Sequence, residues 1–220
     1  MIAYHCIFGM YGFWLPNDPR GSGSDYIAVW ELYRFGRATK TDLRRSVAAA
    51  AHDLALRRAA KEALRFPPVE LTGTQAVTVV EGFAKACDEG NYRIHACAVL
   101  PDHVHMVVGS HPRDIQQVIG HLKSRATTGL KKRELWHADD HPVWGEHGWN
   151  VYLDEPPDVW RAINYVEQNP IKEGKRVQHW SIVTPFDPST VQARRVEKSS
   201  RRIGGAALRS AEQARRKRRG

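Results

Sequence analysis

The chain has 220 residues, and 42% of them are hydrophobic, which is enough apolar material for one well-buried globular core. Its formal net charge of +9 arises at the C-terminal end: residues 191–220 hold 11 of the 33 Lys and Arg but only 2 of the 24 Asp and Glu, so residues 1–190 are formally neutral. No apolar run is long enough for a transmembrane helix and no signal peptide is recognisable, so we expect a cytoplasmic protein without a membrane function.

The first 68 residues predict one strand, one loop and one surface helix. Residues Ala3–Phe8 are typical of a strand, and the Gly- and Pro-rich stretch Trp14–Ser24 excludes regular structure. A helix is expected from about Thr41 to Leu64, on the surface, because its apolar stripe is sparse (Leu43, Val47, Leu54). The sequence Phe66-Pro67-Pro68 ends it.

A helix followed by a hairpin is predicted next. Thr72 and Gln75 have the spacing of a capping box, and the helical period then predicts an inward stripe of Val77, Val80, Ala84 and Cys87. Tyr92–Val99 and His103–Val108 predict two antiparallel strands joined by the tight turn Leu100-Pro101-Asp102.

The remaining elements complete an α+β pattern. An amphipathic helix is expected over Arg113–Arg133, with Ile115, Ile119, Leu122, Ala126 and Leu130 on one face. Trp136–Trp149 is expected to be irregular, Asn150–Leu153 to be a strand, and Pro156-Pro157 to begin a helix with Val159, Ile163 and Val166 facing the core. Hairpin-linked strands interleaved with helices predict an α+β fold in which helices pack on an antiparallel sheet. Residues 1–190 would form this domain, and residues 191–220 a basic, disordered tail.

The most informative motif is His103-Val104-His105. Residues two apart on a strand share a face, so the two imidazoles should project together, as they would to bind a divalent ion. Asp102, the nearest carboxylate, is expected to point to the opposite face from His103. The spacing does not identify the metal, because imidazoles suit zinc or manganese better than magnesium, and a His-x-His pair on a strand is also compatible with a purely structural role.

A second candidate group lies in Tyr165-Val166-Glu167-Gln168-Asn169-Pro170. A helix would place Arg161, Tyr165 and Asn169 on one face, opposite the core. Tyr165 is then a candidate nucleophile for a phosphodiester, with the Asn169 amide as a third metal ligand. Gln168 is the alternative ligand, because a residue that precedes proline is pushed out of the helical region. Three functions stay open: a DNA-nicking and rejoining enzyme, a DNA-hairpin-binding protein without turnover, and a zinc hydrolase that uses water.

The three cysteines indicate the redox state of the protein. Cys6, Cys87 and Cys97 are odd in number and lack a CxxC spacing, so they predict reduced, mostly buried thiols.

The motifs Leu100–His105 and Tyr165–Pro170, together with the opening Tyr11–Gly21, resemble the HUH single-tyrosine transposases, in particular the REP-associated tyrosine transposases. The resemblance implies a ferredoxin-like or RNA-recognition-motif-like HUH fold. It also implies transposition by cleavage of single-stranded or hairpin DNA, dependent on Mg²⁺ or Mn²⁺, through a 5′-phosphotyrosine intermediate. By motif position, His103, His105 and Asn169 would bind the metal and Tyr165 would be the catalytic nucleophile. A homodimer is a candidate assembly, but the insert-like helix between Arg34 and Phe66 departs from the family and bears on any shared interface.

The expected DNA-binding surface combines cationic side chains with one aromatic platform. Single strands are commonly held by basic grooves and by rings on which bases stack. The candidates are Trp14, Arg20, Lys123, Arg125, Arg161 and Lys172.

Overall fold

A computed structural model of the chain describes residues 1–15, 30–35, 53–138 and 140–189. It divides the chain into two compact units, Met1–Thr184 and Pro185–Gly220, and each is described by itself. The basic tail predicted for residues 191–220 lies outside the described residues, as does the first part of the helix expected from Thr41. None of the helices in the described ranges is both long enough and apolar enough to cross a membrane.

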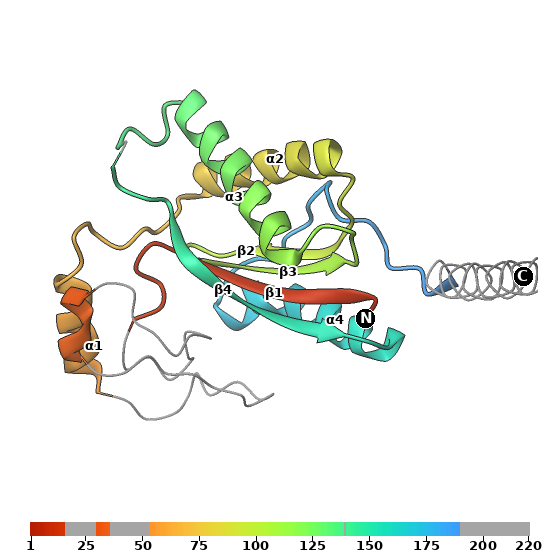
Figure 1. The fold of residues 1–220 in the computed structure, drawn as a ribbon, viewed down its shortest axis with the longest axis horizontal. Helices are drawn as coiled ribbons and strands as arrows, with labels where there is room; N and C mark the ends of the chain where they lie inside the picture. The colour runs from red at the N-terminus through yellow and green to blue at the C-terminus, as the bar shows by residue number, and fades with distance from the viewer. Residues whose placement is uncertain (16–29, 36–52, 139, 190–220) are drawn as a thin grey trace, which may run out of the picture. The chain divides into compact units, whose positions relative to one another are not determined.

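Within its described residues, the first unit contains four strands, four α-helices and one 3₁₀ helix; Figure 1 shows their arrangement. In chain order they are β1 (Ala3–Met10), η1 (Trp30–Phe35), α1 (Leu54–Glu62), α2 (Gly73–Gly90), β2 (Ile94–Val99), β3 (His103–Gly109), α3 (Ile115–Lys132), β4 (Trp144–Leu153) and α4 (Pro156–Lys172).

The four strands form one antiparallel sheet in the order β2-β3-β1-β4. Helices α2 and α3 cover one face of this sheet, and α4 lies against the other face (Figure 1). Apart from α1 and η1, the chain order up to β4 is β-α-β-β-α-β, which is the ferredoxin-like arrangement. The predicted α+β fold with helices packed on an antiparallel sheet is therefore confirmed.

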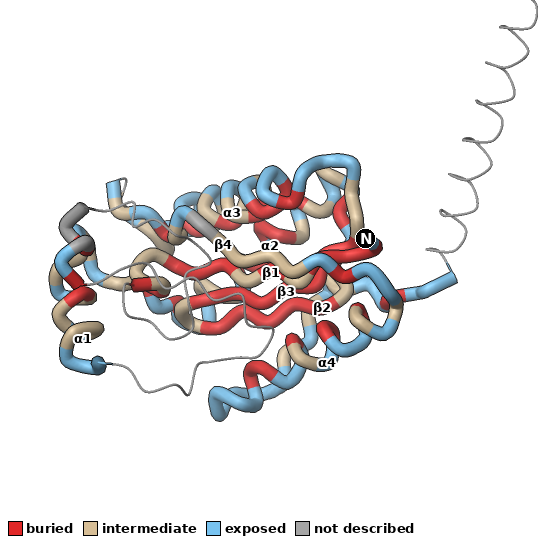
Figure 2. Tube along the Cα trace, turned by 60° about the horizontal axis from the view of Figure 1, so that its bottom comes forward, coloured by how far each residue is buried: buried red, intermediate tan, exposed pale blue. Residues whose placement is uncertain are grey.

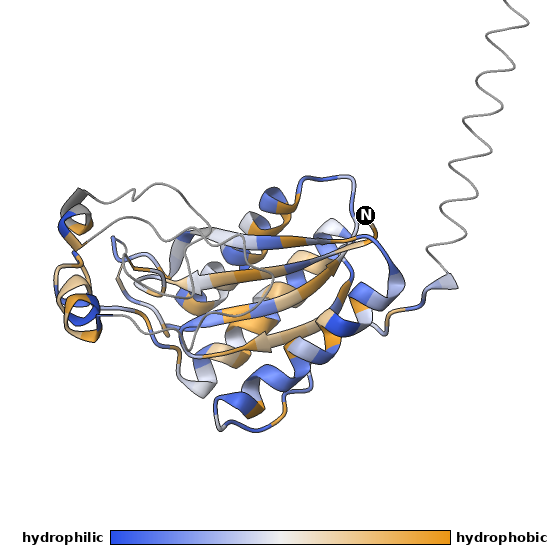
Figure 3. Ribbon diagram, turned by 90° about the horizontal axis from the view of Figure 1, so that it is seen from below, coloured by the Kyte–Doolittle hydropathy of each residue, from blue (hydrophilic) through white to orange (hydrophobic). Residues whose placement is uncertain are grey.

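The hydrophobic core lies between the sheet and the pair α2 and α3. Alternate residues of β1 and β3 point into it, among them Phe8 and Met106, and they meet Phe83 of α2 and Leu122 of α3. Figure 2 shows the central strands as buried, and Figure 3 shows hydrophobic segments along the sheet. Strand β3 is buried at all of its positions, so its side chains on the α4 face are also shielded from water.

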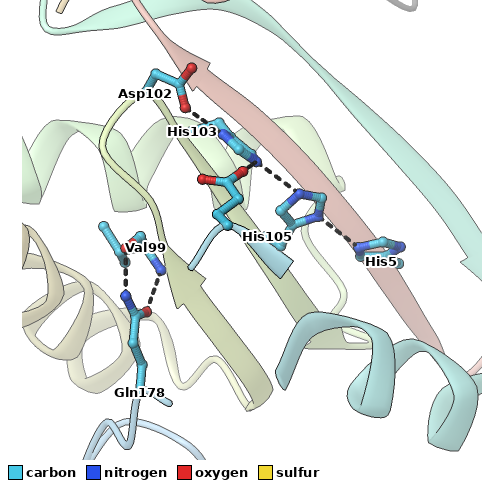
Figure 4. A network of polar contacts seen from close by, with 7 residues as sticks. His5, Val99, Asp102, His103, His105 and Gln178 are labelled. Atoms are coloured by element: carbon cyan, nitrogen blue, oxygen red, sulfur yellow. Dashed lines mark hydrogen bonds and ion pairs between the residues drawn. The ribbon is translucent and has the colours of Figure 1, made fainter. Parts of the chain in front are cut away.

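The predicted hairpin and capping box are confirmed. β2 and β3 pair antiparallel on either side of the turn at residues 100–102, and Thr72 and Gln75 exchange the two hydrogen bonds of the box. The side-chain amide of Gln178 then makes two 2.8 Å hydrogen bonds with the backbone of Val99 (Figure 4). This amide pairs with the open edge of β2 as a neighbouring strand would.

Two local predictions are wrong. Val77 is 45% exposed, because α2 is in contact with both the sheet and α3, and this double contact buries an arc that contains Val79, Phe83 and Ala86 instead. The irregular segment expected up to Trp149 is in fact the first half of β4, which pairs with β1 from Trp144 onward. The indole of Trp144 donates hydrogen bonds to Lys123 O and Thr127 Oγ1 of α3, so tertiary contacts help to hold this strand.

Gly82 allows α2 and α3 to touch through their backbones. A Cβ atom at this position would lie 2.4 Å from the Cα of Ala126. We therefore expect Gly82→Ala to lower the free energy of unfolding by about 1–3 kcal/mol, as overpacked cores do. Gly120→Ala in α3 is the matched control: no atom lies within 4 Å of its Cβ, so the better helix propensity of alanine should stabilise the protein by up to about 1 kcal/mol. Urea denaturation measures the free energy of unfolding of both variants. Equal changes in the two would contradict the close approach of α2 and α3 at Gly82.

Candidate metal and DNA-cleavage site

The predicted histidine pair converges on the α4 face of the sheet. His103 and His105 are each 5% exposed, and their Nε2 atoms lie 3.1 Å apart (Figure 4). Both residues belong to β3, one of the two central strands, where strand alternation places them on one face as predicted. The central strand pairing on both sides therefore fixes the backbone from which the two imidazoles project.

Two further side chains hold the outer nitrogens of these rings (Figure 4). Asp102 Oδ1 accepts a 2.7 Å hydrogen bond from His103 Nδ1, and His5 Nε2 lies 3.3 Å from His105 Nδ1. The expectation that Asp102 points away from His103 is wrong: Asp102 belongs to the turn before β3, where strand alternation does not apply. Contacts of this kind orient metal-binding histidines and set their tautomers. With both Nδ1 atoms protonated, each Nε2 atom carries a lone pair, and the two Nε2 atoms lie 3.1 Å apart.

The spacing of the two Nε2 atoms fits the binding of one divalent ion by both imidazoles. Two nitrogen ligands, each about 2.1 Å from one ion and at a right angle, would be about 3.0 Å apart, close to the observed spacing of the Nε2 atoms. Glu173 Oε1 lies 3.9 Å from His103 Nε2 and adds an oxygen donor to the surroundings. Within the described ranges, no group of three or more His, Cys, Asp and Glu is arranged to hold an ion.

Burial keeps the imidazoles of His105 and His5 neutral, and the neutral form is the one in which a histidine binds a metal ion. Desolvation lowers the pKa of His105 well below its ordinary value, and the neighbouring His103 and His5 lower it further. Desolvation also lowers the pKa of His5 to about 4. Both rings are therefore uncharged at pH 7.

The low pKa of His5 predicts acid sensitivity. In the unfolded chain His5 titrates near 6.5, so between pH 6.5 and 4 the unfolded state binds a proton that the folded state does not. The contribution of His5 to the free energy of unfolding is therefore fully present above pH 6.5. Roughly 3 kcal/mol of it is lost as the pH drops to 4. Denaturation of the metal-free protein at several pH values should show a shallower acid loss for His5→Gln than for wild type. His137→Gln, at an exposed position, should not change the slope, and an unchanged slope in His5→Gln would contradict the assignment.

Tyr165 approaches the histidines from α4. Its ring centroid lies 5.7 Å from that of His105 and 5.5 Å from that of His5, in edge contacts. Burial raises the pKa of the phenol and the charge of Glu173 raises it further, while the amide of Asn169 opposes the rise. The Nζ of Lys172 lies 4.3 Å from the centroid of the Tyr165 ring. The phenol is thus protonated at neutral pH and stands next to a cation.

The two alternative third ligands have different surroundings. Asn169 is 7% exposed. Gln168 is exposed. Pro170 does not end the helix, since α4 continues to Lys172, and Asn169 keeps its helical position one turn after Tyr165. The backbone argument that favoured Gln168 therefore does not hold. The buried side chain of Asn169 brings an amide oxygen, the atom that would bind an ion, one turn from Tyr165.

The predicted DNA-binding residues are dispersed. Lys123 lies on the α3 side of the sheet, where its Nζ donates to Gly145 O at 2.8 Å and sits 5.5 Å from the ring centroid of Phe8; burial lowers its pKa to about 8. The Nε of Arg125 donates to Glu89 Oε2 of α2 at 2.6 Å. The other cation on α4, Arg161, pairs with Asp158 on the exposed surface. Arg20 lies outside the described residues.

Two of the six candidates lie close to the site. Lys172 contacts the ring of Tyr165, as described above. Trp14 is half-buried, with its ring centroid 5.1 Å from that of Phe13, and Phe13 in turn stacks on His103 at 4.5 Å.

Sequence reasoning missed three residues that contact the site, His5, Phe13 and Glu173, and it placed a fourth, Asp102, on the wrong face. His5 had a detectable signal, because it is a histidine on a predicted strand. The proximity of Phe13 and Glu173 has no local signal, since it depends on how the loop after β1 and the end of α4 return to β3.

The fold and this group of side chains define a class of protein: a ferredoxin-like domain with paired histidines on a central strand and a tyrosine on the helix that follows the sheet. Residues 70–152 match the family model described as IS200-like transposase. The matched segment is less than half of the chain; it contains His103 and His105 and ends before Tyr165. This match confirms the resemblance to the transposases that the sequence motifs predict.

Two solved structures are similar to the chain. One is the REP-associated tyrosine transposase bound to a REP hairpin, with 14% identity, a TM-score of 0.44, and coverage of 78% of this chain and 68% of that chain. The other is a candidate transposase from Deinococcus radiodurans R1, with 11% identity, a TM-score of 0.36, and coverage of 80% and 92%, respectively. The comparison with curated proteins found no match.

Proposed function

We propose that the protein nicks and rejoins single-stranded or hairpin DNA through a covalent bond between Tyr165 and a 5′-phosphate. The family match supports the broader statement that it takes part in transposition-related DNA processing. The observation that carries the specific proposal is the convergence of the His103 and His105 Nε2 atoms at 3.1 Å, with the Tyr165 ring against His105 on the same face of the sheet.

A divalent ion, Mg²⁺ or Mn²⁺, is part of this proposal. His103 and His105 would hold it, and the amide oxygen of Asn169, buried one turn after Tyr165, is the third ligand that we favour. Bound there, the ion would offset negative charge on a non-bridging phosphate oxygen and so lower the barrier to attack. Asp102 and His5 keep the two imidazoles in the binding tautomer.

Tyr165 is the nucleophile in the proposed reaction. Its phenolic oxygen forms a bond to phosphorus, the bond from phosphorus to the 3′ oxygen breaks, and the upstream strand leaves with a free 3′-hydroxyl. The phenolic proton passes to water, and the departing 3′ oxygen takes up a proton from water, so the protons balance. The adjacent ammonium of Lys172 favours the phenolate. The reverse attack by a 3′-hydroxyl releases Tyr165 and joins two strand ends, so no nucleotide cofactor is consumed.

The test uses hairpin DNA with a single-stranded extension, labelled at its 3′ end, together with Mn²⁺ or Mg²⁺. A 5′-phosphotyrosine keeps the downstream fragment on the protein, so a labelled band that survives denaturation is expected at the mass of a protein–DNA adduct. DNA binding without an adduct under any metal condition would contradict the proposal and favour a hairpin-binding protein that retains the fold without turnover. The assembly of the chain, including a homodimer, stays a prediction.

A further inference from the structure

A groove beside α1 lies close to the proposed cleavage site and has no assigned role. Its cavity measures ≈430 Å³, within the size range of pockets that hold small molecules. Three cationic side chains and three apolar ones supply most of its lining: Arg58, Lys61, Arg65, Phe66, Pro67 and Pro68. The one carboxylate in the lining is that of Glu62, so the described wall of the groove carries a net positive charge.

The aromatic part of the groove is arranged for stacking. His141 stacks on Phe66 with centroids 4.8 Å apart and planes at 18°, which holds the ring in place. The Arg65 guanidinium lies 4.9 Å from the centroid of the same ring, and its side chain is 76% exposed. Its ion pair with Asp140 is long, at 4.0 Å between exposed partners, and therefore weak. Tyr11 also contacts the Phe66 ring by its edge. A planar group can thus stack on the exposed Arg65 guanidinium that lies over Phe66, or take its place against the ring, at little cost.

The groove leads toward the histidines. A small hollow of ≈10 Å³ shares Lys61 and Pro68 with it and is also lined by Phe13 and Asp102. Phe13 and Asp102 both contact His103. The hollow has room for about one water molecule, so a base would sit in the larger groove while its backbone passes toward the metal site.

We propose that this groove binds a nucleotide of single-stranded DNA that flanks the phosphate to be cut. Cationic side chains beside an aromatic ring are the combination that holds single strands, because every unpaired base has a stacking face and every nucleotide a phosphate. A base pair within a duplex has no free face to offer to Phe66. The inference rests on the proposed function, since it takes the phosphate at His103 as its reference point.

The test measures binding of a fluorescein-labelled ten-nucleotide oligo-dT by fluorescence anisotropy, with an abasic oligonucleotide of the same length and a blunt duplex as further probes. We expect Arg58→Ala and Arg65→Ala each to weaken oligo-dT binding about threefold to tenfold and to reduce the salt slope by about 0.7. Phe66→Leu keeps the apolar bulk but removes the aromatic face, so it should weaken oligo-dT binding by about fivefold or more while leaving abasic binding unchanged. Lys85→Ala, at an exposed cation on α2, is the matched control and should change none of these values.

The outcomes separate the groove from the proposed chemistry. Equal weakening of oligo-dT and abasic binding by Phe66→Leu would overturn the stacking role. Unchanged oligo-dT binding in all three groove variants would overturn the groove as a DNA site, even if the adduct forms as proposed. Tighter binding of the blunt duplex than of oligo-dT in wild type, lost in the Arg variants, would assign the groove to duplex DNA and also contradict the proposal. Normal groove binding without any adduct would instead contradict the proposed cleavage.

Discussion

A Tyr165→Phe variant should form no covalent adduct with DNA and should still bind it. The substitution removes the phenolic oxygen, which is the atom that attacks phosphorus, and it keeps the ring that packs against His5 and His105. We therefore expect cleavage to fall by at least about 10³-fold, the scale seen when a catalytic nucleophile is lost, with little change in stability. Quantifying the denaturation-resistant band against time measures this loss.

Tyr152→Phe is the matched control for this experiment. Tyr152 lies on β4, is 66% exposed, and packs against Tyr4 away from the histidines. Its variant should form the adduct at the wild-type rate. An undiminished adduct in Tyr165→Phe would mean that another residue is the nucleophile, whereas equal losses in both variants would point to a general effect on folding.

Replacing either His103 or His105 by Ala should abolish metal-dependent cleavage. Each variant removes one of the two converging nitrogen donors, and a single imidazole with weak oxygen donors holds an ion poorly. Titration with Mn²⁺, followed by electron paramagnetic resonance of the free ion, should show loss of the binding site without any DNA present. This readout is independent of catalysis.

Variants of other residues should affect Mn²⁺ binding less than the loss of His103 or His105 does. Asp102→Asn keeps the size of the side chain but loses the carboxylate that orients His103, so Mn²⁺ affinity should fall about 10- to 100-fold. His137→Ala changes an exposed histidine and should leave Mn²⁺ binding intact. Cleavage that persists at full rate in His103→Ala or His105→Ala would remove the metal from the proposed mechanism.

Local physical rules account for the parts of the fold that were predicted correctly. The capping box at Thr72, the hairpin around Pro101, and the shared face of His103 and His105 each depend on residues within a few positions of one another. Hydrogen-bond geometry and strand alternation decide such features without reference to the rest of the chain. The buried thiols of Cys6 and Cys97 also agree with expectation.

The predictions that were wrong concern contacts between elements that are distant in the sequence. Val77 has the same helical period as its buried neighbours, but only the position of α3 shows which arc of α2 is covered. Lys123 resembles an ordinary surface cation in the sequence, yet its ammonium turns inward to Gly145 O because β4 passes beside α3. Composition does not encode which strand a helix face will meet.

The sequence by itself determined the α+β element pattern, the pairing of the two imidazoles, and the placement of Tyr165 and Asn169 one turn apart on a helix. Only the tertiary structure decided that α4 lies against the strand that carries the histidines and that His5 from β1 completes their contacts. It also decided that the groove at the end of α1 adjoins a small hollow lined by Asp102. The physical reason is range. Backbone geometry sets spacings of up to one turn, whereas residues as far apart in the sequence as His5 and Tyr165 meet only when burial of the core brings β1, β3 and α4 together.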